Sequence, residues 1–227
     1  MNKEHVELFK GGQLPTEANQ LHRRVSRILK TTTTFTIPFE DRFVEDHKVL
    51  AQMIEMLRSM GCIIAFTTGV WDLFHIGHGD YIEKGKEEAR KLFPDAEYII
   101  MVVGLDTDAF TKLRKGPGRP IVPEDERARV LRHLRPVDII APQYEADQLF
   151  RVVRHDVRII SQSTTDLPEL EMIRQQCTHI VNLPPQAETS TTARIRRLSF
   201  DGAISTLMDV ERRLSQMLKE VHDELEK

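Results

Sequence analysis

The chain is organised around the stretch Thr67-Thr68-Gly69-Val70-Trp71-Asp72-Leu73-Phe74-His75-Ile76-Gly77-His78. An apolar run at residues 62–66 precedes it and predicts a buried strand, because it is rich in β-forming residues. The segment that follows, residues 79–91, is long enough and contains enough charged residues to form an amphipathic helix. A strand, a glycine-bearing turn and a helix therefore meet here, with His75 and His78 where the helix begins.

Such a turn is suited to binding phosphate. Exposed N–H groups and the helix dipole favour negative charge at a helix start. The imidazoles of His75 and His78 would add donors on one face, because residues three apart are neighbours on a helical turn. Gly77 has no Cβ and lets a ligand approach the backbone. Taken alone, the pair could also be half of a zinc site, although no Cys/His partner pair lies at metal spacing, or ordinary helix-start residues.

Length and composition fit one α/β domain with extensions, or two small domains. The 227 residues are 40% apolar and 30% charged. The net charge of −3 and the pI near 6.3 give no electrostatic case for a nucleic-acid partner. Only Cys62 and Cys177 are present, and we find neither a signal peptide nor an apolar run near the ~18 residues that span a membrane. We therefore expect a soluble, cytoplasmic protein without membrane contact.

Strand and helix patterns alternate beyond the central stretch. Strands are expected at residues 97–104, 137–141 (closed by Pro142), 157–160 and 178–183, with a polar loop at 105–108. Helices are expected at residues 124–134, 146–154 and 168–176. This alternation predicts an α/β fold with a Rossmann-like, doubly wound parallel sheet. Such sheets bind ligands beyond the carboxyl ends of their strands, where the His75–His78 turn lies.

Both ends of the chain predict helices. Apolar residues recur at helical spacing within 16–30 and 41–60, so the N-terminal extension (residues 1–60) should be a helical pair packed on the central domain or on a partner subunit. The central domain spans residues 61–200. The C-terminal amphipathic helix, residues 201–227, carries apolar residues at seven-residue offsets. That seam suits a coiled-coil contact in a homodimer or packing against the N-terminal helices.

Two further motifs follow the central stretch. The second is Thr111-Lys112-Leu113-Arg114-Lys115-Gly116-Pro117-Gly118-Arg119-Pro120, expected as a cationic loop after a strand, although its charges alone are more typical of a solvated turn. It leads to Arg127, on a helix that is opened by Pro123. The third is Thr189-Ser190-Thr191-Thr192, whose hydroxyls can cap a helix and bind phosphate at the same place.

In this order, the three motifs resemble the HxGH nucleotidyltransferase superfamily. The likeness is to its cytidylyltransferase-like group, which includes glycerol-phosphate cytidylyltransferases and heptose-phosphate adenylyltransferases, and it covers residues 62–198. The segment from Lys115 to Pro120 is similar to the Lys-Gly-x-Gly-Arg-Pro pattern of the heptose-phosphate enzymes. Arg127 matches a helix arginine that approaches the nucleotide phosphates in this family.

The resemblance implies an enzyme that transfers AMP or CMP from an NTP to a phosphorylated sugar or alcohol and releases pyrophosphate. The implied catalytic residues are His75, His78, Lys115 and Arg127. The implied nucleotide-binding residues are Thr67, Thr68, Gly69, Val70, Trp71, Asp72, Gly77, Arg127, Ser190, Thr191 and Thr192. Arg114, Lys115 and Arg119 are the implied acceptor-binding residues. Asp72 is expected to orient the turn, and Mg²⁺ is expected to arrive with the NTP without a protein metal site.

Three alternatives to an ATP-dependent sugar-phosphate enzyme are open. One is a glycerol-phosphate-type cytidylyltransferase that uses CTP. Another is a catalytically silent nucleotide-binding regulatory protein. The presence of both His75 and His78 argues against this alternative. A Rossmann dehydrogenase is the weakest, because no G-x-G-x-x-G follows the first strand. The expected partners are an NTP, a phosphorylated small molecule and a second copy of the chain.

Overall fold

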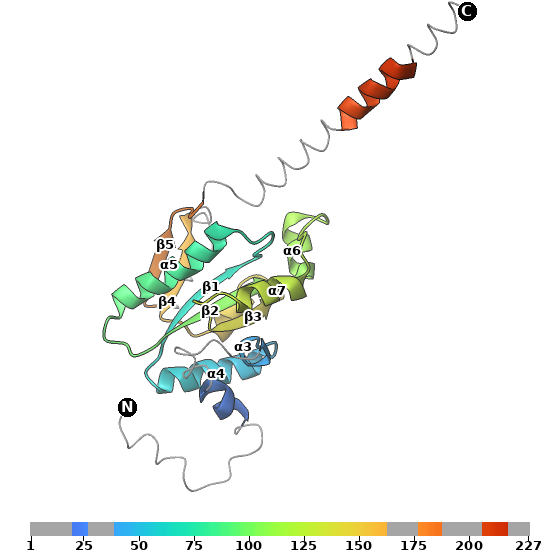
Figure 1. Ribbon diagram of the computed structural model, residues 1–227. Coiled ribbons are helices and arrows are strands. Elements are labelled where there is room, and N and C mark those ends of the chain that lie inside the picture. Colours follow the sequence, from blue (N-terminus) through green and yellow to red (C-terminus); the bar gives the residue numbers. More distant parts are fainter. Residues whose placement is uncertain (1–19, 27–38, 163–176, 188–205, 218–227) are drawn as a thin grey trace, which may run out of the picture. The chain divides into compact units, whose positions relative to one another are not determined.

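A computed structural model describes residues 20–26, 39–162, 177–187 and 206–217 (Figure 1). The chain forms two compact units, Met1–Gln186 and Ala187–Lys227. The first unit contains a sheet with helices on both faces. The second contains helical residues 206–217.

A parallel sheet of five strands forms the centre of the first unit, in the order β3-β2-β1-β4-β5. The strands are β1 Ile63–Gly69, β2 Ile99–Asp106, β3 Ile139–Gln143, β4 Val157–Ser161 and β5 His179–Leu183. Strand β1 pairs along its whole length with β2, whereas it pairs with β4 only through Ala65 and Phe66. The strand order reverses between β1 and β4, which is where doubly wound sheets bind ligands. The predicted Rossmann-like α/β fold is confirmed.

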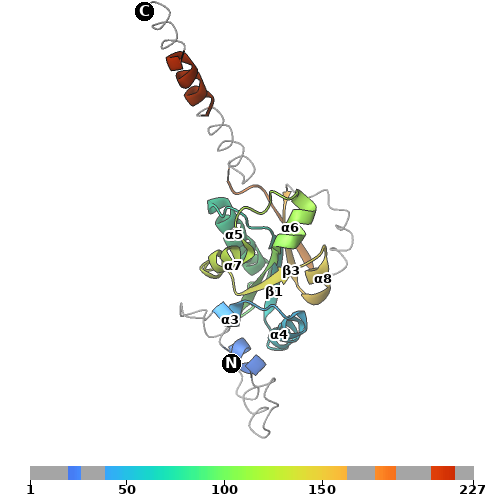
Figure 2. The same cartoon turned by 90° about the vertical axis from the view of Figure 1, so that its right-hand side faces the viewer.

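Helices cover both faces of this sheet (Figure 2). Helices α4 His47–Ser59 and α8 Gln148–Val152 lie on one face, and α5 Ile76–Leu92 and α7 Glu124–Arg132 lie on the other. Two shorter helices are α3 Phe39–Arg42, which precedes α4, and α6 Asp108–Lys115, which follows the carboxyl end of β2. The crossover helices therefore bury both sides of the strands, as their continuous apolar sequences require.

Two apolar clusters hold these layers together. In β1, Ile64 and Phe66 face the cluster that contains α4 and α8, whereas Ala65 joins the cluster that contains α5 and α7. The buried face of α4 consists of Leu50, Met53, Ile54 and Leu57. Val25, from the helical residues 20–26, is buried in the same cluster. Parts of the N-terminal helices thus pack directly on the sheet within this unit.

The expectation of one continuous helix over residues 41–60 is wrong. The chain leaves the helix after α3, and Val44 N donates to Ile140 O at 2.9 Å beside the edge strand β3. The Asp46 carboxylate then accepts from Lys48 N at 2.7 Å and begins α4 as its N-cap. An N-cap aspartate satisfies N–H groups that a longer helix would bond internally, which explains the break.

The expected loop after β2 is also wrong, because β2 continues to Asp106 and residues 108–115 form α6. The Thr107 hydroxyl caps this helix by accepting from Phe110 N at 3.2 Å, and Gly116 ends it with a φ of 93°. Strand β3 likewise continues through Pro142 to Gln143. A proline is tolerated there because β3 is an edge strand, on which one side needs no donor.

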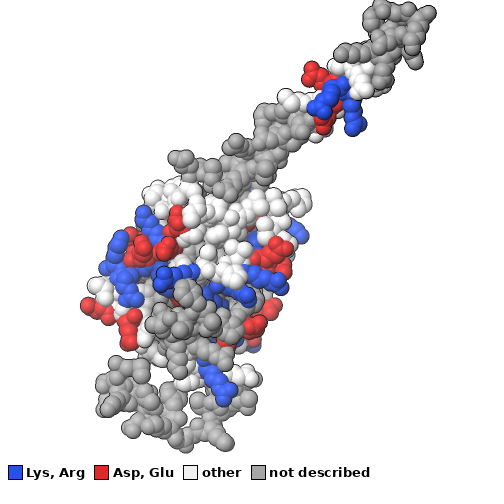
Figure 3. Space-filling model, viewed as in Figure 1, with Lys and Arg blue, Asp and Glu red and all other residues white. Residues whose placement is uncertain are grey.

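The remaining predicted segments are described only in part. Helix is seen at residues 20–26 and 206–217 within the two terminal predictions, and Leu207, Val210, Leu214 and Met217 are exposed on the second. The predicted helix at 168–176 lies outside the described residues, and the homodimer stays a prediction. None of the described helices is both long and apolar enough to cross a membrane. On the face in Figure 3, basic and acidic side chains of the described residues are interspersed, in keeping with the small net charge.

Candidate active site

The central stretch forms the turn between β1 and α5, at the carboxyl end of the sheet (Figure 1). His75 is the N-cap of α5 in an extended conformation, and its side chain makes no capping hydrogen bond. Its carbonyl accepts from His78 N at 2.9 Å, which starts the helix. Because the imidazole does not cap the helix, the first-turn amides retain donor capacity for a ligand.

The two histidines lie against each other, as their spacing predicts. The ring centroids of His75 and His78 are 4.0 Å apart, with an interplanar angle of 25°. Trp71 packs edge-on against His78 at 5.6 Å, and Phe74 contacts the same ring at 5.2 Å. These aromatic contacts fix the orientation of His78. Gly77, between the histidines, is buried, so this turn of the helix lies close to the sheet.

The turn itself has an unusual backbone. Trp71 and Leu73 adopt positive φ values of 56° and 45°, a conformation that costs free energy for residues with a Cβ. Trp71 is held there because its indole Nε1 donates to Gly104 O on β2 at 2.9 Å. A Cβ on Gly69 would lie 3.0 Å from the same indole, so glycine makes room for this ring. Tertiary contacts therefore impose the shape of the turn.

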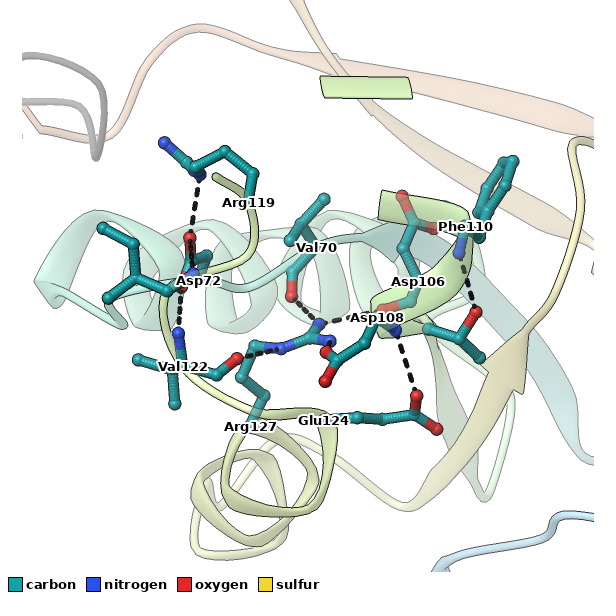
Figure 4. Close-up of polar contacts among 11 residues, drawn as sticks. Val70, Asp72, Asp106, Asp108, Phe110, Arg119, Val122, Glu124 and Arg127 are labelled. Carbon is teal, nitrogen blue, oxygen red and sulfur yellow. Dashed lines mark hydrogen bonds and ion pairs between the residues drawn. The ribbon is translucent and has the colours of Figure 1, made fainter. Parts of the chain in front are cut away.

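Asp72, between these two residues, connects the turn to the segment before α7 (Figure 4). Its buried carboxylate accepts from Ile121 N at 3.0 Å and from Val122 N at 2.9 Å. It also forms an ion pair with Arg119, whose Nε lies 3.0 Å from Oδ2. Asp72 thus links the turn to residues 119–122. The contact also places Arg119, a predicted acceptor-binding residue, next to the β1–α5 turn.

Arg127 forms a second connection in the same region (Figure 4). Its guanidinium is buried and donates to Val70 O, to Asp106 O at 2.9 Å and to Val122 O at 2.9 Å. It also forms an ion pair with Asp108 at 2.6 Å. Its donors are thus shared among carbonyls directly after β1, at the end of β2 and before α7, and a carboxylate at the start of α6. In this conformation the side chain joins the strand ends from inside the protein.

The carboxyl end of α6 provides the remaining predicted cations. Arg114 forms an ion pair with Asp106 at 3.1 Å, and Gln143 Nε2 donates to the other oxygen of that carboxylate at 3.0 Å. Burial raises the pKa of Asp106, although the nearby cations oppose this shift. Surrounding protein atoms desolvate the Lys115 amine, and Arg119 and Arg114 repel it, so its pKa is lowered. Such crowded cations would be relieved by an anion.

Thr67 and Thr68 face different sides of β1. The Thr67 hydroxyl lies 3.1 Å from the phenol oxygen of Tyr81 on α5, and burial raises the pKa of that phenol. The Thr68 hydroxyl accepts a hydrogen bond from Arg158 on β4 at 3.0 Å. Both hydroxyls thus lie close to the end of β1, next to the turn that carries the histidines.

The structure brings most of the predicted site residues to one edge of the sheet. The predicted residues Ser190, Thr191 and Thr192 lie outside the described residues. Sequence reasoning did not assign Asp106, Asp108, Tyr81, Gln143 or Arg158 to the site. The positions of Asp106 and Asp108 directly after an apolar strand were the available signal. For Arg158 it was a charge inside an apolar strand.

The arrangement can bind and polarise phosphate groups. It combines helix-start amides and two imidazoles with cations at the end of α6, all near the reversal point of the sheet. The described ranges contain no group of three His, Cys, Asp or Glu side chains that could hold a metal ion. The histidine pair beyond the first strand is also the feature that carries the resemblance to the HxGH nucleotidyltransferases.

Comparisons with known proteins make this assignment more specific. The chain belongs to the cytidylyltransferase-like family, whose model matches residues 66–198. The Bifunctional protein HldE of a Nitratiruptor species is 30% identical over 162 residues, which are 70% of this chain and 32% of that protein. Its counterpart in Syntrophotalea carbinolica is 37% identical over 91 residues, which are 40% of this chain and 17% of that protein. The chain thus matches a third or less of the length of these relatives.

Solved structures include similar chains. A lipopolysaccharide core biosynthesis protein from Thermoplasma volcanium has 25% identity and a TM-score of 0.41, over 53% of this chain and 95% of that chain. A pantoate-beta-alanine ligase from Francisella tularensis has 13% identity and a TM-score of 0.46, over 66% of this chain and 68% of that chain.

Proposed function

We propose that this protein transfers a nucleoside monophosphate from an NTP to a phosphorylated sugar or alcohol. A phosphate oxygen of the acceptor attacks the α-phosphorus, the bond from that phosphorus to the bridging oxygen breaks, and pyrophosphate leaves. The observation that carries the proposal is the stacked pair His75 and His78 at the start of α5, beyond the carboxyl end of β1.

The proposed reaction needs no general base, since the acceptor phosphate is already ionised near pH 7. Catalysis then consists of aligning the two reactants and stabilising charge that develops on the α-phosphate. His75 and His78 would donate to the α-phosphate oxygens, assisted by the first amides of α5. The aromatic contacts of Trp71 and Phe74 with His78 favour this role, because they hold the donor in place before the ligand binds.

The other predicted residues would divide between the two substrates. Lys115, with Arg114 and Arg119, would bind the acceptor phosphate, and the lowered pKa of Lys115 supports this role because an anion would relieve the crowding. Ser190, Thr191 and Thr192 would contact the β- and γ-phosphates. Arg127 would act at these phosphates only by exchanging some of its present contacts. With its present contacts, Arg127 holds together the ends of β1 and β2 and the start of α6.

Mg²⁺ would arrive on the triphosphate, where it neutralises charge on the leaving group. Mg²⁺ in nucleotide sites is commonly held by phosphates and water with one or two carboxylates.

We propose ATP and a sugar phosphate as the first substrates to test. Support comes from the Lys115–Pro120 segment, which resembles heptose-phosphate adenylyltransferases, and from the similarity to the proteins named HldE. CTP with glycerol phosphate is the alternative. The two pairs of substrates differ in the nucleotide base and in the acceptor.

A thermal-melt panel with ATP, CTP, GTP and UTP, each with Mg²⁺, tests the nucleotide site. A nucleotide at 100 times its Kd should stabilise the chain by ~2.7 kcal/mol, which is visible as a raised midpoint. We expect ATP to raise the midpoint of the wild type most, and His78→Ala to reduce the shift. His133→Ala removes an exposed histidine at the end of α7 and is the matched control. A wild type that responds to no nucleotide would contradict the proposed site.

A further inference from the structure

Arg158 is a charged residue inside an otherwise apolar strand. It is the second residue of β4 and lies opposite Phe66 of β1, at the pair of strands where the order of the sheet reverses. Only 4% of the residue is exposed. A buried guanidinium has a large desolvation cost unless a counter-charge or a full set of acceptors offsets it.

The surroundings of Arg158 offset this cost only in part. The guanidinium lies over two aromatic rings, 4.6 Å from the centroid of Phe66 and 4.3 Å from that of Phe150. Nη2 donates to the Thr68 hydroxyl at 3.0 Å, but the buried Nε and Nη1 have no hydrogen-bond partner among the described residues. Desolvation lowers the pKa of Arg158 to about 10, so the group is still a cation at neutral pH.

Two other arginines of this unit, the half-buried Arg58 and the buried Arg127, have carboxylate partners. Arg58 pairs with Asp156 at 2.7 Å beside the amino end of β4, and Arg127 pairs with Asp108 at 2.6 Å. No described carboxylate lies within ion-pair distance of Arg158. Asp147 and Asp106 act on it only through longer-range attraction. Arg158 thus stands out among these arginines as a desolvated cation without a described counter-charge.

The contact with Thr68 directs this cation towards the ligand site. Thr68 precedes Gly69, the last residue of β1, and its side chain is half-buried. A hydroxyl has one donor and two acceptor sites, and Arg158 occupies an acceptor site. The hydroxyl hydrogen of Thr68 is therefore left to donate elsewhere. The neighbouring strand end, between β1 and β4, is where a ligand would bind.

We propose that Arg158 is a positioning residue for a phosphate group of the substrate. It holds the Thr68 hydroxyl as a donor to that phosphate, and its own positive charge is neutralised when the phosphate binds. This inference rests on the proposed function and adds to it a residue on β4. The phosphate belongs either to the NTP or to the acceptor, and the two sources are separated by the choice of probe.

Thermal melts of the full chain test the proposal with four probes: MgATP, MgCTP, inorganic phosphate and glycerol phosphate. Arg158→Met keeps the apolar stem and removes the charge. We expect its ligand-free midpoint to equal or exceed that of the wild type, because an uncompensated buried charge is lost. Its ligand-induced shift should fall to less than half, and Arg158→Lys should recover part of it. Arg58→Met, the control, should lower the ligand-free midpoint and keep the full shift.

Loss of the shift with the nucleotides would assign the phosphate to the NTP, and loss with phosphate or glycerol phosphate alone would assign it to the acceptor. Thr68→Val should reproduce the loss, and the double variant with Arg158→Met should be no worse than either single variant, because the two residues act as one unit. In turnover assays, KM for the assigned substrate should rise about tenfold, with kcat changed far less.

Two results would overturn the inference and leave the proposed function intact. One is a wild-type ligand shift in Arg158→Met. The other is a loss of stability in Arg158→Met, seen either as a ligand-free midpoint that falls as far as in Arg58→Met or as failure to fold. Such a loss would make Arg158 a structural residue. If the wild type responds to inorganic phosphate through Arg158 but to no nucleotide, the phosphate-positioning role of Arg158 is kept and the proposed nucleotide transfer is contradicted. A wild type that responds to none of the probes contradicts both.

Discussion

The Asp72 carboxylate lies 3.0 Å from the Arg119 guanidinium, and both side chains are largely shielded from water. The same carboxylate accepts from two backbone amides, Ile121 N and Val122 N. One side chain in the β1–α5 turn thereby holds the segment that follows the cations of α6. The turn that carries the histidine pair and the segment that carries Arg119, which is proposed to bind the acceptor, are thus parts of one connected structure.

Asp72→Asn tests this connection. The amide keeps the shape of the side chain but removes the charge and one of the two acceptor oxygens. We expect the free energy of unfolding to fall by about 1–3 kcal/mol, because a buried N–H is left without an acceptor. Turnover should fall as well, since the two parts of the site are no longer held together. Equal stability in urea and equal turnover would show that Asp72 does not connect the two segments.

Arg127 should be essential for folding stability. Arg127→Met leaves the Asp108 carboxylate and the carbonyls of Val70 and Asp106 without their donor, which should cost about 3–5 kcal/mol. Arg129→Met, an exposed change on the same helix, should stay within about 0.5 kcal/mol of the wild type. Urea denaturation measures both. An Arg127 variant as stable as the Arg129 variant would assign the side chain a role at the ligand instead.

Helix α5 reaches the sheet at Gly85. A Cβ added there would lie 2.7 Å from Ile159 Cδ1 on β4, too close for a real contact. We expect Gly85→Ala to lower the free energy of unfolding by about 1–3 kcal/mol through overpacking. Ile159→Val removes the nearest atom and should recover part of the loss in the double variant. Gly79→Ala, whose Cβ would meet Phe74 at 3.9 Å, should not destabilise the chain. Additive losses in the double variant would contradict the contact.

His155 should make stability depend on pH. Its imidazole is buried against Phe66 and Phe150, and desolvation lowers its pKa from 6.5 to about 4. Between these values the unfolded chain binds a proton that the folded chain does not. Stability is therefore full above pH 6.5 and falls on acidification towards pH 4, by up to about 3 kcal/mol. Denaturation of the wild type and His155→Phe across this range measures the difference, and identical pH slopes would contradict it.

The sheet was predictable because its strands are continuous apolar runs, such as residues 99–106, separated by helical patterns. Helix α6 was not, because Lys112, Arg114 and Lys115 next to Gly116 have the composition of a solvated turn. Its helical form depends on the Thr107 cap and on burial of Phe110 against the rest of the fold.

The candidate site likewise has a part that could be predicted from the sequence and a part that could not. The stacking of His75 and His78 follows from their spacing, which is a local property of a helix start. The contacts of Arg127 could not be predicted, since its acceptors come from the ends of β1 and β2, far away in the sequence. The surroundings of Arg158 likewise become visible only when the two aromatic rings and the neighbouring strands are in place.

Pyrophosphate release from MgATP or MgCTP, in the presence of sugar phosphates and glycerol phosphate, is the direct measure of the proposed transfer. The wild type should release pyrophosphate with at least one such pair of substrates. His78→Ala should lower kcat by about 10²–10⁴-fold, the range for loss of a donor to the transition state, and His133→Ala should leave kcat unchanged. Turnover of His78→Ala close to that of the wild type would contradict the assignment of the histidine pair to the reaction.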